Sequence, residues 1–157
     1  MSHLDLFPTI CDLAGLQLPS WQQGHSLLPL LQRKAESVRD AVFAEINHHV
    51  EHEPMRAIRT ERYKYIRNFG LTKYLLPNLD TSEIRSFLVG NGFLDSEKPQ
   101  EMLFDLYLDP VERVNLAQGE QYSEVKVALE KELIEMDACH PRPFGRRRCA
   151  ASQVKLA

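Results

Sequence analysis

The sequence predicts an α+β fold, in which a small antiparallel sheet is covered by a helix near the carboxyl-terminal end. Residues 41–46 and 102–108 are apolar-rich runs of strand length, and residues 55–68 alternate apolar and basic side chains with a period near two. Residues 122–136 instead repeat apolar side chains at helical spacing. A group of strands followed by one helix favours an α+β arrangement over alternating strands and helices.

The first 40 residues predict short helices and loops. Apolar residues recur at helical spacing over residues 4–14, Pro8 suits a first helical turn, and Gly15 suits the position just after a helix. A second apolar segment at residues 26–32 contains Pro29, which limits any helix there.

The central part of the chain predicts the first strands of the sheet. A strand at residues 41–46 is followed by a histidine-rich loop at residues 47–54. Residues 55–60 and 62–68 then predict an antiparallel hairpin. Its register is ambiguous, but one alternation places these side chains on a common face: Met55, Ala57, Tyr63 and Tyr65.

The remaining elements are a loop-rich segment, a strand and a helix. Residues 70–100 are rich in glycine and proline, with one helix expected at residues 81–89. The strand at residues 102–108 ends at the turn-forming pair Asp109-Pro110, so Asp105, Asp109 and Asn115 are interpreted as turn residues, and the two aspartates not as paired catalytic acids. The sequence thus predicts three regions: residues 1–40, an α+β subdomain at 41–136, and a basic tail at 137–157.

The charge distribution argues against nucleic-acid binding. The tail holds five basic residues and one acid, whereas the first 136 residues hold 14 basic and 21 acidic residues, which gives net charges of +4 and −7. No apolar stretch is long enough to span a membrane, and the first residues lack the features of a signal peptide. Three cysteines without paired spacing suggest free thiols, so we expect a cytoplasmic location.

Several motifs in order resemble the carboxyl-terminal part of the sulfatase family, which belongs to the alkaline-phosphatase superfamily. They are SHLDLFPTICDLAGLQLP, GHSLLPLL, VFAEI, PMRAIRTERYKYIRNF and MLFDLYLDPVERVNLA, and they extend over about residues 2–136. The EINHH and PMR segments are most similar to the heparan N-sulfatase branch. The resemblance implies hydrolysis of a sulfate ester or sulfamate, on a sulfated carbohydrate, by a parental enzyme.

The resemblance also implies a formylglycine nucleophile and a bound calcium ion, for which this chain offers no residues. Formylglycine forms from Cys or Ser in a C/S-x-P-x-R motif, and the nearest match, the run from Cys139 to Pro143, has proline in place of the final arginine. No cluster of carboxylates suits calcium. We therefore expect no catalytic residue and no cofactor in this chain, which would be inactive by itself.

Both ends of the chain depart from the family pattern. The matching motif begins next to Met1, so we expect a truncated domain in which the apolar face of Leu4, Phe7, Ile10 and Cys11 lacks its cover and promotes self-association. At the other end, one back-translation of residues 136–145, read one base later, gives Trp-Met-Pro-Ala-Thr-His-Asp-Pro-Leu-Gly, which resembles the usual family ending. A frameshift near Glu135 is therefore our hypothesis for the tail.

The histidine-rich loop supplies the candidate site. His48, His49 and His52, with Arg56, could line the rim of a sulfatase pocket and contact an anionic sugar, or they could belong to a solvated polar loop. The run from His48 to His52 also matches the H-x-x-E-H motif of a zinc hydrolase, although that chemistry requires a helix, which Pro54 disfavours.

A second group of basic residues lies on the predicted hairpin: Arg59, Arg62, Lys64 and Arg67. These side chains could hold a sulfated glycan, or they could be the solvent-facing side of a sheet. The leading hypothesis is a sulfatase carboxyl-terminal fragment. The alternatives are a non-catalytic α+β interaction module and, less favoured, a small zinc hydrolase.

Overall fold

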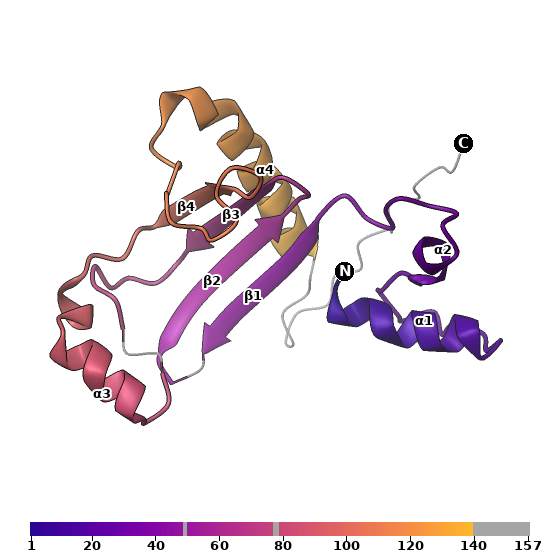
Figure 1. Cartoon of the computed structure of the whole chain (residues 1–157), viewed down its shortest axis with the longest axis horizontal. Helices are drawn as coiled ribbons and strands as arrows, with labels where there is room; N and C mark the ends of the chain where they lie inside the picture. Colours follow the sequence, from indigo (N-terminus) through magenta and orange to yellow (C-terminus); the bar gives the residue numbers. More distant parts are fainter. Residues whose placement is uncertain (49, 77–78, 140–157) are drawn as a thin grey trace. The chain divides into compact units, whose positions relative to one another are not determined.

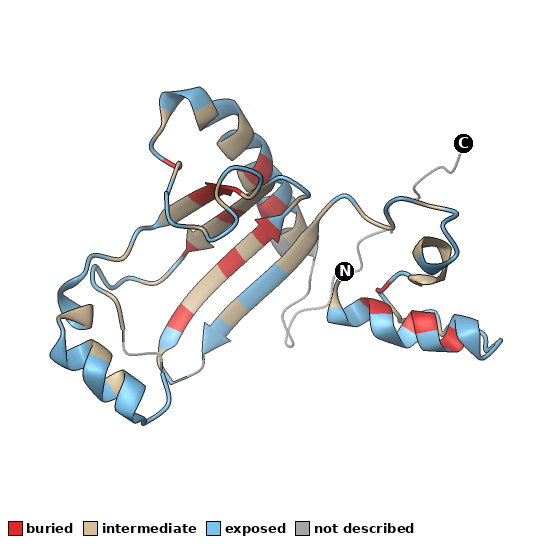
Figure 2. Ribbon diagram, viewed as in Figure 1, coloured by how far each residue is buried: buried red, intermediate tan, exposed pale blue. Residues whose placement is uncertain are grey.

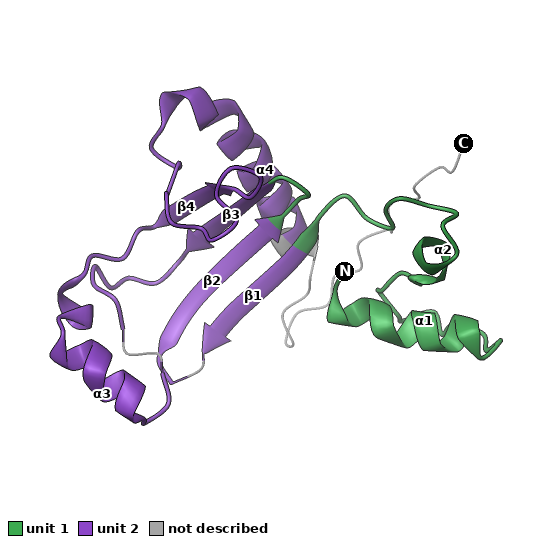
Figure 3. Ribbon diagram, viewed as in Figure 1, with its two compact units in different colours: residues 1–42, 59–62 green, residues 43–58, 63–157 purple. Residues whose placement is uncertain are grey.

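The computed structural model describes residues 1–48, 50–76 and 79–139. The chain divides into two compact units (Figure 3). The first unit comprises Met1–Val42 and Arg59–Arg62, and the second comprises Phe43–Ile58 and Tyr63–Ala157. The predicted boundaries at residues 40 and 136 stay predictions, and most of the predicted tail, residues 140–157, lies outside the described residues.

The first unit contains the short helices that the sequence predicts. A 3₁₀ turn, η1 (His3–Asp5), leads into α1 (Leu6–Leu13), and α2 (Leu28–Leu31) follows after a loop. Gly15 has a φ of 66°, a left-handed conformation that glycine adopts without steric cost after a helix.

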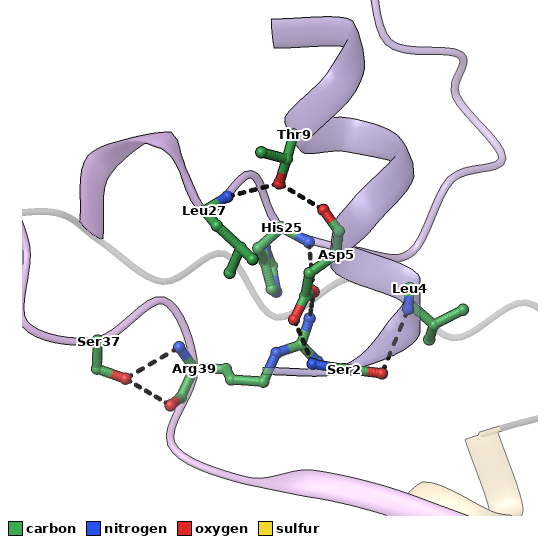
Figure 4. Close-up of polar contacts among 8 residues, drawn as sticks. All are labelled: Ser2, Leu4, Asp5, Thr9, His25, Leu27, Ser37 and Arg39. Atoms are coloured by element: carbon green, nitrogen blue, oxygen red, sulfur yellow. Dashed lines mark hydrogen bonds and ion pairs between the residues drawn. The ribbon is translucent and has the colours of Figure 1, made fainter. Parts of the chain in front are cut away.

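A buried carboxylate connects the segments of the first unit (Figure 4). Asp5 is fully buried and accepts hydrogen bonds from the backbone N–H of Ser2, at 2.7 Å, and of His25, at 3.0 Å. The Arg39 guanidinium forms an ion pair with the same carboxylate. Burial alone raises the pKa of Asp5, but these hydrogen bonds and the Arg39 charge outweigh it, so the pKa is lowered. One aspartate therefore joins three separate stretches of sequence.

The two faces of α1 differ in exposure (Figure 2). Pro8, Thr9 and Cys11 are buried, and the Thr9 hydroxyl accepts a hydrogen bond from the backbone N–H of Leu27. Much of the apolar surface of the first unit is exposed, including Leu4, Phe7, Ile10, Leu13, Leu16 and Trp21. Cys11 was expected on this exposed face. That expectation is wrong, because Cys11 follows Pro8 by three residues and shares its buried side of the helix.

The second unit is built on a four-stranded antiparallel sheet with the strand order β1-β2-β3-β4 (Figure 1). The strands are β1 (Val42–His48), β2 (His52–Arg59), β3 (Tyr63–Asn68) and β4 (Glu101–Asp105). Between β3 and β4, Tyr65 pairs with Leu103 and Arg67 pairs with Glu101. The predicted fold class, an α+β fold with a small antiparallel sheet, is confirmed.

The strands differ from the prediction in their limits and in one register. The predicted loop at residues 47–54 is shorter, because β1 extends to His48 and β2 begins at His52. In β2 the buried residues near the middle are Arg56 and Ile58, whereas Met55 and Ala57 are only partly buried. The predicted face containing Met55 and Ala57 is therefore wrong for β2, because a shift of one residue exchanges the two faces of a strand.

The long helix α4 (Ser123–Cys139) covers one face of this sheet (Figure 1). The buried core includes Tyr65, Leu103, Leu129 and Leu133. The Glu101 carboxylate accepts a hydrogen bond from the Tyr65 hydroxyl at 2.8 Å and pairs with the Lys126 ammonium at 3.2 Å. Burial and the neighbouring Glu101 carboxylate raise the pKa of Tyr65. Helix and sheet are thus joined by apolar packing and by polar contacts.

The segment after β4 forms turns, as predicted for its aspartates and Asn115. The Asp105 carboxylate accepts from the N–H of Tyr107 at 3.1 Å, and the Asp109 carboxylate accepts from the N–H of Val114 at 2.8 Å. The Asn115 side chain accepts from the N–H of Leu103 at 3.0 Å and donates to the carbonyl of Glu101 at 2.9 Å. These bonds fasten the segment along the edge of β4.

An excursion of the chain separates β3 from β4. It carries the predicted helix, observed as α3 (Glu83–Gly90), and the turn η2 (Phe93–Asp95). Its two arms pair through an isolated bridge between Tyr74 and Glu97. A further turn, η3 (Glu120–Tyr122), precedes α4. Among the helices of the described residues, none has both the length and the apolar character needed to cross a bilayer.

Candidate substrate-binding site

The antiparallel order of the strands brings the candidate residues to one end of the sheet. β1 ends at His48, β2 begins at His52, β3 ends at Asn68 and β4 begins at Glu101. In an antiparallel meander these four ends lie at the same side of the sheet. The histidine-rich turn and the junctions of the excursion between β3 and β4 therefore share this end, which we call the histidine end (Figure 1).

The predicted histidines occupy the tips of the first two strands. His48 and His52 are both exposed, so their imidazoles are available to a ligand in solvent. His49 lies outside the described residues. Two imidazoles at a strand-to-strand turn can donate hydrogen bonds to an anionic oxygen. Their role in substrate binding stays a prediction.

Arg56 occupies a different environment from the histidines. Its side chain is only 8% exposed, and its Nε lies 3.3 Å from the Glu45 carboxylate. Its guanidinium also donates to the carbonyl of Met55 at 2.9 Å and to that of Ile46 at 3.3 Å. These contacts fix Arg56 between β1 and β2, where it supports the strands that carry the histidines.

The H-x-x-E-H run does not form the helix that a zinc hydrolase of this type requires. His48 ends one strand and His52 begins the next, so the two side chains are not on one helical face. Over residues 1–48, 50–76 and 79–139, no three His, Cys, Asp or Glu side chains gather as a metal site. The described residues therefore offer no group of ligands that fits a calcium ion.

The basic residues of the hairpin include two that are paired with acids. The Lys64 ammonium lies 2.6 Å from the Glu112 carboxylate, and the Arg67 guanidinium forms an ion pair with Glu130 of α4. Arg67 also lies over the Phe69 ring, with 5.4 Å between the guanidinium carbon and the ring centroid. Lys64 and Arg67 thus act within the fold, which favours the interpretation of a sheet surface over a glycan-binding face.

A polar cluster at the histidine end was missed by the sequence reasoning. The Lys98 ammonium lies 3.1 Å from the Glu53 carboxylate, with both side chains less than a tenth exposed. Asn68 is also buried, and its side chain accepts a hydrogen bond from the N–H of Gly70. Glu53 and Lys98 are far apart in sequence, so only the folded sheet reveals the pair. The only feature of the sequence that could have indicated this pair is the presence of charged residues near the predicted strand ends.

Comparisons with known proteins agree on one family. A family profile described as the C-terminal region of N-sulphoglucosamine sulphohydrolase matches residues 1–83. An ulvan-active sulfatase of Formosa agariphila is 35% identical over 136 residues, which cover 83% of this chain and 27% of that protein. A delta 4,5-hexuronate-2-O-sulfatase of Bacteroides thetaiotaomicron is 33% identical over 126 residues, which cover 78% and 20%.

Solved structures give the same result for the fold. A 2-O GAG sulfatase superposes with a TM-score of 0.59 at 29% identity, over 85% of this chain and 23% of that one. A phosphonate monoester hydrolase of Agrobacterium radiobacter superposes with a TM-score of 0.56 at 26% identity, over 85% and 24%. The chain spans about a quarter of the length of the relatives it matches.

Proposed function

This chain belongs to the sulfatase family, matching its C-terminal region, and from this premise we propose that it acts as the carboxyl-terminal part of an enzyme that desulfates carbohydrate. The observation that carries the proposal is the extent of the match: the family profile covers residues 1–83, and two carbohydrate-related sulfatases are 33–35% identical over 78–83% of this chain. The substrate class comes from the names of those relatives. This chain would contribute substrate contacts rather than the attacking group.

The histidine end is the part of the chain that we propose to contact substrate. His48 and His52 are exposed there, and Arg56 fixes the strands behind them through Glu45 and two carbonyl groups. Together with His49, these two exposed histidines would donate charge-assisted hydrogen bonds to a sulfated sugar. The chain supplies no C/S-x-P-x-R motif, so we propose that it has no sulfatase activity by itself.

The exposed apolar face of α1 supports the second part of the proposal, which concerns a partner. Leu4, Phe7 and Ile10 are 44–63% exposed, and Trp21 is 71% exposed while stacked on Phe7 at 5.5 Å between ring centroids. Large contiguous apolar surfaces of this kind mark interaction sites. We propose that this face packs against the remainder of a sulfatase and, without it, against a second copy of the chain.

A chimeric enzyme tests the catalytic proposal. The matched region of the Formosa agariphila sulfatase is replaced by residues 1–136, and desulfation of that enzyme's own substrate is measured. We expect activity in the chimera and none in the isolated chain. His48→Ala and His52→Ala should raise KM about tenfold, consistent with the loss of one charge-assisted hydrogen bond each. His25→Ala, in the first unit, is the matched control and should leave KM unchanged.

The outcomes separate the candidate functions. Turnover by the isolated, metal-free chain would contradict the proposal that it lacks the catalytic machinery. A folded chimera without activity, or with histidine variants indistinguishable from His25→Ala, would favour the non-catalytic interaction module. Light scattering tests the proposed role of the apolar face. At increasing concentration the chain should show association that Ile10→Glu abolishes, and a stable monomer of the unmodified chain would contradict the proposal.

A further inference from the structure

A buried ion pair lies next to one of the exposed histidines at the histidine end. The Lys98 Nζ is 3.1 Å from the Glu53 Oε1, and the two side chains are 5% and 8% exposed. Glu53 directly follows His52 at the start of β2, whereas Lys98 belongs to the excursion between β3 and β4. The pair therefore joins the base of the excursion to the strand end that carries His52.

Other contacts of Lys98 fix the place of its ammonium group. The ammonium donates to the Thr72 hydroxyl at 3.1 Å, and the backbone N–H of Lys98 donates to the Lys73 carbonyl at 2.8 Å. Both partners lie in the opposite arm of the excursion. A Cβ added to Gly70 would lie 2.8 Å from the Lys98 Nζ, so the glycine allows the ammonium to lie this close to the backbone. Lys98 is thus bound to both arms of the excursion as well as to Glu53.

A second lysine–glutamate pair in the excursion has a different environment. The Lys73 Nζ lies 2.7 Å from the Glu97 Oε1, but those side chains are 66% and 67% exposed. Water competes for the charges of an exposed pair, which therefore holds its segments only weakly. A buried pair adds little net stability over an apolar pair, but breaking it leaves an unpaired charge, so it selects one arrangement of the segments it joins. The Glu53–Lys98 pair is therefore better suited to fixing an arrangement than to adding stability.

The pair acts on the direction of His52 because Glu53 and His52 are neighbours in a strand. Successive side chains of a strand point to opposite faces of the sheet, so a fixed Glu53 side chain sets the rotation of the strand at His52. The carbonyl of the next residue, Pro54, accepts a hydrogen bond from the N–H of Phe69 at 2.8 Å. His52 is thus exposed to solvent, while the two residues that follow it are bound to other segments.

Resting on the function proposed above, we propose that Glu53 and Lys98 are positioning residues, which fix the direction in which the His52 imidazole is presented to a sulfated sugar. Neither side chain has to touch the sugar, because both are buried and their charges compensate each other. The effect passes through His52, and it is lost when either partner of the pair is removed.

NMR relaxation of the full chain tests the positioning without any substrate. The backbone order parameter of His52 should be about 0.85 in the unmodified chain and below about 0.6 in Lys98→Met, because the unpaired Glu53 carboxylate draws the strand end towards water. Lys73→Met is the matched control, since it breaks the exposed pair of the same kind, and it should leave His52 rigid. An order parameter of His52 that Lys98→Met leaves unchanged would overturn the proposal.

A second variant disturbs the pair without removing a charge. Gly70→Ala places a methyl group against the Lys98 Nζ, so the ammonium should move away from Glu53 while both charges remain. It should lower the order parameter of His52, as Lys98→Met does. Gly90→Ala is its control, because an added Cβ there meets nothing within 4 Å. Identical order parameters in the two alanine variants would also overturn the proposal.

A double-mutant cycle in the chimera shows whether the pair acts through His52. Lys98→Met alone should raise KM about tenfold, like His52→Ala, with kcat unchanged. The two changes together should raise KM about tenfold rather than about a hundredfold, because the histidine that Lys98 positions is already absent. An additive effect, or a fall in kcat, would show a general structural role and overturn the proposal. If His52→Ala itself leaves KM unchanged, the function proposed above fails, whereas the relaxation data still decide whether the pair positions His52.

Discussion

Each of the two units of this chain is stabilised internally by a different kind of interaction. In the first unit the largest fully buried side chains are Asp5 and Pro8, and Pro8 and Cys11 are the only buried apolar side chains among its described residues. In the second unit Ile58, Tyr65 and Leu103 are fully buried, and Leu129 and Leu133 of α4 are buried as well. The first unit is thus organised by a hydrogen-bonded carboxylate and exposes its apolar side chains, whereas the second has a conventional core. We infer that the first unit is the part that depends on a partner.

The largest expected effect is the loss of the buried carboxylate in the first unit. Asp5→Ala removes the acceptor for two backbone N–H groups and leaves Arg39 without its ion-pair partner, which should cost about 3–5 kcal/mol. Hydrogen exchange by NMR should then show loss of protection in α1 and retention in the sheet. Asp12→Ala, which removes an exposed bond to Ser26, is the control and should have little effect. Equal loss in both units would contradict the comparison.

The corresponding change in the second unit removes part of its apolar core. Leu103→Ala creates a cavity at a fully buried position of β4 and should cost about 2–5 kcal/mol. Protection should fall in the sheet and in α4 while the amides around Asp5 keep theirs. Val127→Ala, at an exposed position of α4, is the control. If Leu103→Ala lost less stability than Val127→Ala, the apolar core would not be the main support of this unit.

A smaller effect is expected from a close backbone contact in the first unit. A Cβ added to Gly24 would lie 1.8 Å from the Leu4 carbonyl oxygen, which is backbone and cannot move aside easily. Gly24→Ala should therefore cost about 1–3 kcal/mol, again with the loss confined to the first unit. Gly90→Ala serves as the open-space comparison. Similar midpoints of urea unfolding for these two variants would show that the contact relaxes.

The smallest expected effect is the loss of stability of the second unit at acidic pH. Burial by itself raises the pKa of Glu101, but the bonds from Tyr65 and Lys126 and the nearby charges outweigh it, so the pKa is lowered from 4.5. A lowered carboxylate pKa stabilises the fold above the ordinary value and loses that contribution as pH falls through the folded-state value. The second unit should therefore lose stability below about pH 4.5, by less than about 1 kcal/mol. Glu101→Gln should flatten this dependence, and an unchanged slope would contradict it.

The elements of the chain also differ in how far the sequence predicts them. Turn residues were predictable, because Asp105, Asp109 and Asn115 satisfy nearby backbone groups through short-range geometry. The face of β2 was not, because Arg56 is buried by pairing with Glu45 of the neighbouring strand, and no local pattern shows that partner. The exposure of α1 was largely predicted, apart from Cys11, since helical spacing alone determines which residues share a face.

The candidate site also contains residues that the sequence indicates and residues that only the fold reveals. The exposed histidines could be proposed from the sequence, because a run of imidazoles near a strand end is visible in the residues themselves. The cluster of Glu53, Asn68 and Lys98 could not, because its members come from two strands and from the excursion between β3 and β4.

The sequence by itself determined the family, the order of helices and strands, and the positions of the turns, because these depend on motifs and on residues close together in the chain. The tertiary structure decided which charges are buried and which partners they pair with. Those properties depend on contacts between residues far apart in sequence, and only the pairing of strands brings such residues within hydrogen-bonding distance.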